Sequence, residues 1–291
     1  SFLQHVYTTW KRVPRYVVLL GKGTYDYKNV TQQGTNLLPP IMVPTPEGMF
    51  ASDNRFADVA GDDGVPEYAL GRIPVVSNEE FNDYLAKLSS SENNRGSWRS
   101  NVLLTAEVKD GQADFKAQAE AMAVLAGNQS VYRIYLDELP IADARTSLQT
   151  DLNINGMAVM THVGHGGMDR LAAGGLLTMP DVQNNLSNAN QLPFLSALSC
   201  LINRFEIPGV NLILGEILIT APNGGASAVW APTGTSIDSH AALLGRKLFE
   251  AIYGKGINRV GDAVVETMRS FRSEVAVKPV MLDVYVLLGD P

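Results

Sequence analysis

Short apolar runs alternate along the chain with longer stretches in which apolar residues return every three or four positions. The short runs predict strands and the longer stretches predict helices, since a helix repeats every 3.6 residues. Strands are expected at residues 15–20, 68–74, 101–104, 131–136, 156–163, 193–198 and 226–230. Helices are expected at residues 78–88, 114–126, 179–186, 210–220, 241–253 and 260–271.

This alternation predicts an α/β fold, in which a mostly parallel sheet carries helices on both faces. The strands are rich in Val, Leu and Ala throughout, as expected for a sheet that is buried on both sides. A polar stretch, ENNRGS at residues 92–97, follows the first strong helical pattern. We expect a boundary there, between a smaller N-terminal α/β subdomain at 1–93 and a larger subdomain at 94–291.

Composition excludes some classes of function. The chain has 291 residues, 45% of them hydrophobic, and a net charge of −7, which is ordinary for a globular protein. No run of Lys or Arg is present, which argues against a nucleic-acid partner or an anionic membrane surface. No apolar stretch reaches the roughly 20 residues that a membrane span needs. Without an initiating Met or a signal-peptide pattern, we expect a fragment or a processed domain of a larger parent.

His165 and Cys200 occupy equivalent positions after two successive predicted strands, 156–163 and 193–198. Sequential parallel strands are usually neighbours, so both side chains are expected at one edge of the sheet. An ordinary thiol has a pKa of about 8.5, and a neighbouring imidazole favours the nucleophilic thiolate. Gly166 has no Cβ, so a substrate carbonyl can approach the backbone closely. The N–H groups of Gly166 and Cys200 are the expected oxyanion hole.

The alternative for Cys200 is an inert packing thiol. Cys200 is the only cysteine, so no internal disulfide can form. Its place at a strand end, opposite a His-Gly turn, favours the nucleophile. His162 lies inside the preceding strand, and we expect it to pack or to support His165.

The motifs around these residues resemble those of the gingipain family, the C25 peptidases of the caspase, legumain and gingipain clan. The resemblance implies a caspase-like three-layer sandwich, with residues 94–291 as the catalytic subdomain. It also implies a cysteine endopeptidase that forms a thioacyl-enzyme on Cys200, with His165 as general base and acid. The matching segments run in the family's order and cover most of the chain: ASDNRFADVAGDDGVPEYALGRIPV (51–75), GHGG (164–167), LPFLSALSC (192–200), GGASAVWAPTGTS (224–236) and LLGDP (287–291).

The same resemblance implies an acidic partner for the histidine, which maps to Glu107 in the loop after residues 101–104. Asp110 lies close in that loop and could serve instead. The family's chemistry needs no catalytic cofactor, and its substrate is a protein or peptide. The resemblance further implies an extracellular, periplasmic or cell-surface location, and a pro-segment or other domains of the parent as partners.

Three residues are candidates for the substrate pocket. Asp238 lies in the loop that lines the gingipain pocket for the residue before the scissile bond, and a carboxylate there would favour Arg or Lys. The alternative for Asp238 is an exposed turn residue. Trp230 and Met168 are candidate pocket walls.

Oxygen donors cluster in one glycine-containing segment, and hard cations such as calcium favour such ligands. Related gingipain-type domains bind calcium structurally, so a structural calcium site is expected here. The alternative is a solvated turn. The candidate ligands are Asp53, Asp58, Asp62, Asp63 and Glu67.

Two rival functions stay open at this stage. A sortase-like transpeptidase or signal peptidase would use the same Cys200–His165 pair but would pass the acyl group to an amine. An inactive interaction domain would carry an unreactive Cys200, and the intact pair argues against it.

Overall fold

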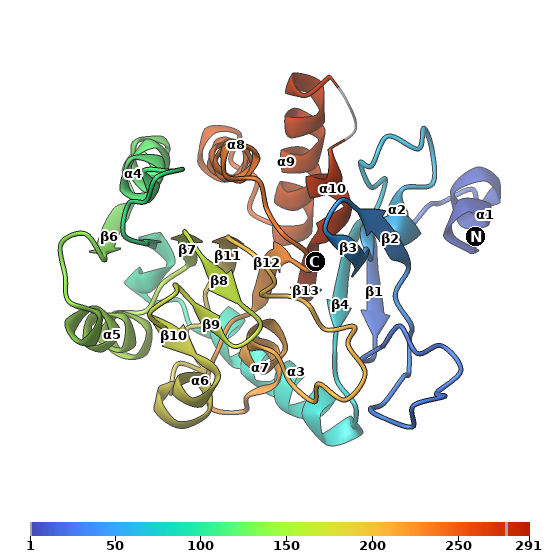
Figure 1. The fold of residues 1–291 in the computed structure, drawn as a ribbon, viewed down its shortest axis with the longest axis horizontal. Helices are drawn as coiled ribbons and strands as arrows, with labels where there is room; N and C mark the ends of the chain where they lie inside the picture. Colours follow the sequence, from blue (N-terminus) through green and yellow to red (C-terminus); the bar gives the residue numbers. More distant parts are fainter. Residues whose placement is uncertain (1, 277–278) are drawn as a thin grey trace.

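The computed structural model describes residues 2–276 and 279–291. Within them, eight strands form one central sheet, which Figure 1 shows between two layers of helices. All neighbouring strands are parallel except β12 and β13, which run antiparallel. In spatial order the strands are β1 (Tyr16–Leu20), β4 (Ala69–Ile73), β13 (Tyr285–Gly289), β12 (Ala228–Pro232), β11 (Phe194–Leu198), β7 (Val159–Val163), β5 (Asn101–Ala106) and β6 (Ser130–Tyr135).

Helices cover both faces of the sheet because alternate strand residues point to opposite sides. Along β5, Leu103 enters one apolar cluster, while Val102 and Leu104 enter the other. The first cluster is covered by α3 (Asn78–Asn93), α5 (Ile141–Thr150), α6 (Met179–Asn185) and α7 (Leu214–Thr220). The second is covered by α4 (Phe115–Leu125), α8 (Asp238–Phe249) and α9 (Val260–Glu274).

Shorter elements surround this core. The short helices α1 (Phe2–Thr9), α2 (Asn54–Ala57) and α10 (Val280–Val284) lie toward the β1 end of the sheet (Figure 1). A small antiparallel sheet follows His165 and contains β8 (Gly166–Gly167), β9 (Arg170–Leu171) and β10 (Leu177–Thr178). A hairpin of β2 (Met42–Thr45) and β3 (Gly48–Ala51) lies near α10.

The predicted fold class is confirmed: the chain is an α/β sandwich with a mostly parallel sheet. Each predicted strand and helix is present, with ends shifted by a few residues. The largest shift at a helix end is in the segment predicted at 78–88, because α3 continues to Asn93. The segment predicted at 210–220 becomes helical only at Leu214. Within the large sheet and the long helices on its faces, the helix α5 and the strand β13 were not predicted, and neither were the shorter elements around this core.

The boundary at residue 93 stays a prediction. Both large-sheet strands of residues 1–93, β1 and β4, continue the same sheet as the rest of the chain. Their connection runs through β13, where the register pairs Leu288 with Arg72. No helix in the described part of the chain is long and apolar enough to cross a membrane.

Candidate active site

The sheet register places His165 and Cys200 side by side. β7 and β11 pair in parallel up to Val163 and Leu198, and each candidate residue lies two positions beyond its paired strand end. Gly166 packs directly against the Cys200 turn. A Cβ on Gly166 would lie 2.5 Å from Ser199 Oγ and 3.2 Å from Cys200 O. A side chain would not fit there, so glycine is what lets the two strand ends approach.

Cys200 is partly buried in a strained turn. The next residue, Leu201, has a φ of +63°, a conformation that residues with a Cβ rarely adopt. The Ser236 N–H donates a hydrogen bond to the Cys200 sulfur at 3.4 Å. Burial raises the pKa of the Cys200 thiol, the Ser236 N–H lowers it, and the Asp238 carboxylate raises it. The thiol therefore needs a base or a cation to ionise readily.

His165 is exposed and its ring lies between an acid and an aromatic side chain. Its Nε2 is 3.0 Å from Asp110 Oδ2, and the ring packs edge-on against Phe115 with centroids 5.5 Å apart. The N–H groups of Gln112 and Ala113 hold the pKa of Asp110 low, and His165 adds to this effect. Across residues 2–276 and 279–291, no hydrogen bond joins His165 to Cys200 in this conformation. Catalytic hydrogen bonds are often long without substrate and shorten in the productive complex.

Glu107 lies beside this pair but makes a different contact. It is buried, and its Oε2 accepts a hydrogen bond from Ala173 N at 2.9 Å. Burial raises the pKa of Glu107, the Ala173 N–H lowers it, and His165 lowers it further. Its Cβ packs against Gly164, where a Cβ added to the glycine would come within 2.3 Å of it. The acidic partner thus stays a prediction: Asp110 contacts the imidazole, and Glu107 acts on it electrostatically.

His162 holds the main chain of His165 in place through a hydrogen bond to the His165 carbonyl. The ring is fully buried, with Nδ1 2.9 Å from Thr105 Oγ1 and Nε2 3.0 Å from His165 O. A carbonyl only accepts, so Nε2 carries the proton and the Thr105 hydroxyl donates to Nδ1. Burial lowers the pKa of His162 to about 4, so the ring is neutral at pH 7.

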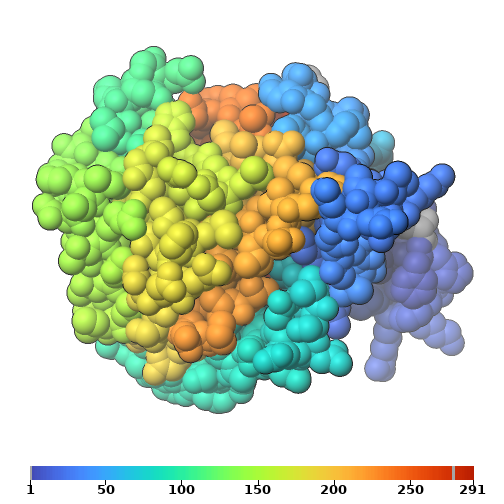
Figure 2. All heavy atoms as spheres, turned by 60° about the horizontal axis from the view of Figure 1, so that its bottom comes forward, coloured from blue at the N-terminus to red at the C-terminus, as the bar shows by residue number. Residues whose placement is uncertain are grey.

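The segment after Cys200 is held on both sides. Figure 2 shows it as an orange band between the yellow β10–α6 region and the blue N-terminal segment. On one side Tyr25 N donates to Glu206 O at 2.9 Å, and on the other Leu214 N donates to Met168 O at 2.6 Å. Lys22 adds a buried ion pair of 2.8 Å with Glu216. These contacts fix the segment between Cys200 and α7 on both sides.

The three predicted pocket residues differ in position. Asp238 begins α8, is half-buried and acts electrostatically on Cys200. No described residue forms a hydrogen bond or ion pair with its carboxylate. Met168 is also half-buried and lies one residue after β8. Trp230 is fully buried and packs on Tyr285 at a ring distance of 5.2 Å, so it cannot line a pocket in this structure. Its place on β12 turns the side chain into the core.

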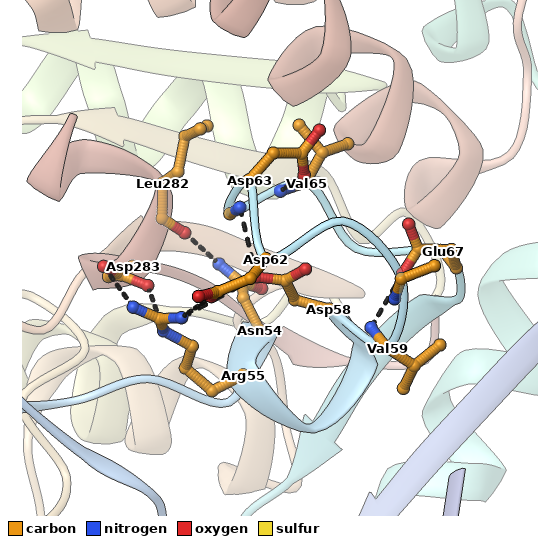
Figure 3. Close-up of polar contacts among 12 residues, drawn as sticks. Asn54, Arg55, Asp58, Val59, Asp62, Asp63, Val65, Glu67, Leu282 and Asp283 are labelled. Carbon is orange, nitrogen blue, oxygen red and sulfur yellow. Dashed lines mark hydrogen bonds and ion pairs between the residues drawn. The ribbon is translucent and has the colours of Figure 1, made fainter. Parts of the chain in front are cut away.

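The expected metal ligands do not converge on one point. Asp53 is buried in a bidentate ion pair with Arg72, with Oδ2–Nε and Oδ1–Nη2 distances of 2.6 and 2.7 Å. Figure 3 shows the carboxylates of Glu67, Asp58 and Asp63 at N–H groups of their own loop. Glu67 accepts from Val59 N at 2.7 Å, and Asp63 accepts from Val65 N at 2.9 Å.

Arg55 stands where the sequence led us to expect a cation. Its guanidinium is 2.8 Å from Asp62 Oδ1, 3.7 Å from Asp58 Oδ2 and 2.6 Å from Asp283 Oδ1 (Figure 3). Among the described residues no group of three or more His, Cys, Asp and Glu side chains could hold a metal ion. The arrangement therefore does not fit the predicted calcium site. The physical reason is that Arg55 and Arg72 already supply the positive charge.

Two residues at the site were not predicted from the sequence. Ser236 donates to the Cys200 sulfur from the loop after β12, and it ends the quoted motif APTGTS. Tyr285 lies beneath it, with its hydroxyl 2.9 Å from Ser236 Oγ. No sequence signal links Tyr285 to Cys200, because the contact depends on the antiparallel placement of β13.

Comparison with known proteins decides the family. The profile of peptidase family C25 matches residues 1–291. The chain belongs to this family. The predicted resemblance to C25 cysteine peptidases is thereby confirmed. No curated protein matches the chain significantly.

Solved structures agree with the C25 assignment at the level of the fold. The crystal structure of the Arg-specific cysteine proteinase gingipain R (RgpB) has a TM-score of 0.81 and 20% identity, covering 100% of this chain and 66% of that one. A complex of the pro- and mature domains of Porphyromonas gingivalis RgpB gives 0.81 and 20%, covering 100% and 67%. A third structure, described only as a protease, gives 0.78 and 16%, covering 99% and 67%. The C25 chain thus spans about two thirds of the length of these matches.

Proposed function

We propose that this protein is a cysteine endopeptidase with Cys200 as nucleophile and His165 as general base and acid. The observation that carries the proposal is the register of β7 and β11, which brings both residues to one sheet edge two positions past their paired ends. Membership of family C25 supports it. A packing thiol would not need the close approach of Gly166 to Cys200 or the strained turn at Leu201.

In the proposed mechanism His165 takes the thiol proton and the Cys200 thiolate attacks the substrate carbonyl carbon. The resulting oxyanion is held by N–H groups of Gly166 and Cys200. The tetrahedral intermediate collapses to a thioester as His165 protonates the leaving amine. Water, deprotonated by His165, then attacks the thioester and releases the carboxylic acid and the thiol.

The ladder of the small sheet supports Gly166 as an oxyanion donor. Ala172 N donates to His165 O at 3.0 Å, so these residues form a hydrogen-bonded pair. Hydrogen-bonded and non-hydrogen-bonded pairs alternate in antiparallel ladders. The next pair, Gly166 with Leu171, is therefore of the second kind, and the Gly166 N–H is directed away from β9. That donor is available to a substrate oxyanion.

We further propose that Asp238 favours Arg or Lys before the scissile bond. Its carboxylate is half-buried, is close enough to Cys200 to raise the thiol pKa, and has no partner among the described side chains. An unpaired carboxylate next to the nucleophile is available to a substrate cation. The relative RgpB is described as an Arg-specific proteinase, which is in line with this proposal.

The test uses the fact that Cys200 is the only cysteine. A peptidyl chloromethyl ketone with Arg before the reactive group should label the wild type and leave Cys200→Ala unlabelled. His165→Ala should slow labelling by about 100-fold or more, the contribution of a general base. Asp238→Asn should selectively slow the Arg reagent relative to an otherwise identical norleucine reagent. Absence of labelling in folded wild type would contradict the peptidase, and equal slowing of both reagents would contradict the pocket alone.

The same proposal covers partners and location. A protein or peptide substrate follows from the proposed reaction. A pro-segment and a location outside the cytoplasm stay predictions from the family, and a pro-domain is named only for the relative RgpB. Adding an amine acceptor to the assay separates hydrolysis from transpeptidation, because only the latter yields a new amide.

A further inference from the structure

Tyr285 links two segments that hold the nucleophile. Its hydroxyl is 2.9 Å from Ser236 Oγ. Burial raises the pKa of Tyr285, and the backbone N–H of Ser199, the residue that directly precedes Cys200, lowers it. Ser236 in turn donates its own N–H to the Cys200 sulfur, so one buried hydroxyl contacts the loop that faces the sulfur.

Either hydroxyl can donate in the Tyr285–Ser236 hydrogen bond, because each is both a donor and an acceptor. Burial raises the pKa of Tyr285, so the hydroxyl stays protonated over the working range of a peptidase. The ring itself is fixed by Trp230, with centroids 5.2 Å apart.

Residues 233–237, which join β12 to α8 and which we call the Ser236 loop, depend on the contact between Ser236 and Tyr285. The loop is anchored at its start, where Leu201 N donates to Gly234 O at 3.0 Å. Beyond Gly234, the Ser236 side chain bonds to Tyr285 and the chain then enters α8 at Asp238. A hydrogen bond from the Ser236 N–H to sulfur strengthens when the thiol becomes a thiolate, because it then has a charged acceptor.

We propose that Tyr285 is a positioning residue for catalysis: its hydroxyl holds the Ser236 N–H on the Cys200 sulfur and so stabilises the thiolate. The kinetic consequence rests on the proposed peptidase function. The effect on the thiol does not, because it is a property of Cys200 in the folded protein. Asp238 and Tyr285 interact electrostatically with Cys200, and His165 lies beyond the end of the neighbouring strand.

The experiment measures the rate of Cys200 alkylation by iodoacetamide as a function of pH. Tyr285→Phe keeps the packed ring and removes only the hydroxyl. We expect the apparent pKa of alkylation to rise by on the order of half a pH unit. On a peptide substrate that the wild type cleaves, we expect kcat/KM to fall about tenfold, mostly through kcat, because the thiolate acts in the chemical step.

A double-mutant cycle identifies the contact. Ser236→Ala removes the other end of the same hydrogen bond but keeps the backbone N–H. Each single variant should raise the alkylation pKa by a similar amount, and the double variant should add little to either. Fully additive shifts would overturn the proposal, since they would mean that the two hydroxyls act through separate contacts.

A matched control separates positioning from general stability. Tyr84 is also fully buried, and its hydroxyl donates to Ser227 O and accepts from Asp290 N, both at 2.8 Å. Tyr84→Phe should lower the melting temperature without changing the alkylation profile. If Tyr285→Phe likewise lowers stability alone and leaves the profile unchanged, Tyr285 is only structural and the proposal is wrong.

The two proposals fail in distinguishable ways. Unchanged alkylation in Tyr285→Phe, with intact peptide cleavage by the wild type, overturns the role of Tyr285 and keeps the peptidase. A shifted alkylation profile in Tyr285→Phe, together with a wild type that cleaves no peptide, supports the role of Tyr285 and counts against the peptidase.

Discussion

His162 is buried with both ring nitrogens hydrogen-bonded, and its protonation is therefore linked to folding. One nitrogen donates to the carbonyl of His165 and the other accepts from Thr105, so a second proton would force the Thr105 hydroxyl to turn from donor to acceptor. The residue touches no substrate. It fixes the main chain from which the proposed base projects.

The first prediction concerns stability against pH. Burial lowers the pKa of His162 to about 4, against 6.5 for a free histidine. Between these values the unfolded state binds more protons, so the free energy of unfolding should fall as the pH drops from 6.5 to 4. The full effect of this group is about 3 kcal/mol. Urea unfolding of the wild type and His162→Gln at several pH values measures it, and parallel curves for the two proteins would contradict it.

The second prediction separates the two candidate acids. Asp110→Asn should reduce kcat by about 10- to 100-fold, because it weakens the contact that orients the His165 ring. Glu107→Gln keeps an acceptor for Ala173 N but removes a charge near the imidazole, so its effect should be smaller. Peptide cleavage by both variants measures this. A larger loss in Glu107→Gln would make Glu107 the partner and leave the Asp110 contact as a resting arrangement.

At the scale of elements, the loop after α2 shows how arginine takes the place of a metal ion. Arg55 joins Asp62 of this loop to Asp283 of α10, and Asn54 bonds to two carbonyls nearby, Leu282 O at 2.7 Å and Tyr285 O at 2.6 Å. The acidic segment therefore binds the C-terminal part of the chain. Through Tyr285 it also supports the proposed active site.

The third prediction follows from this replacement. The melting temperature of the wild type should not change between millimolar calcium and a chelator. Arg55→Gln should lose about 2 kcal/mol, because it leaves buried carboxylates without their cation. Differential scanning calorimetry tests both statements. A calcium-dependent rise in the wild type that disappears in Asp58→Asn would show that the loop binds the ion after all.

Sequence patterns predicted those elements whose own residues show a clear apolar periodicity and a turn signal at the end. Segments such as 156–163 are largely apolar on both faces and are followed by glycine, which is enough to predict a buried strand and the exposed turn with His165. β13 was missed because its five residues directly follow α10 and carry no turn signal. The choice between Glu107 and Asp110, and the inward direction of Trp230, depend on tertiary contacts that a single sequence does not contain.

At the scale of the whole molecule, β13 holds the sheet together. It lies between β4 and β12, and its residues are buried throughout. Its five-residue pairing with β12 is extensive, whereas its register with β4 contains one matched pair, Leu288 with Arg72. The sheet is therefore held less firmly between β4 and β13 than elsewhere.

The fourth prediction uses amide hydrogen exchange. The strands β13, β12, β11 and β7 should exchange slowest, because they lie inside the sheet under helices on both faces. The edge strand β1, with Val18 and Leu20 about half exposed, should exchange fastest among the strands of the large sheet. Exchange of β1 and β4 as one unit, separate from the rest, would support a boundary near residue 93. Equal protection of β1 and β13 would contradict the predicted order.

The position of β13 also has a consequence for biosynthesis. A ribosome makes His165 and Cys200 more than 80 residues before it makes Tyr285. Until residues 285–289 leave the exit tunnel, β12 has no partner on one side and the Ser236 loop has no phenol to bind. The proposed nucleophile is thus translated early but its surroundings are completed late, so the nascent chain cannot assemble the proposed thiolate site before β13 has been made.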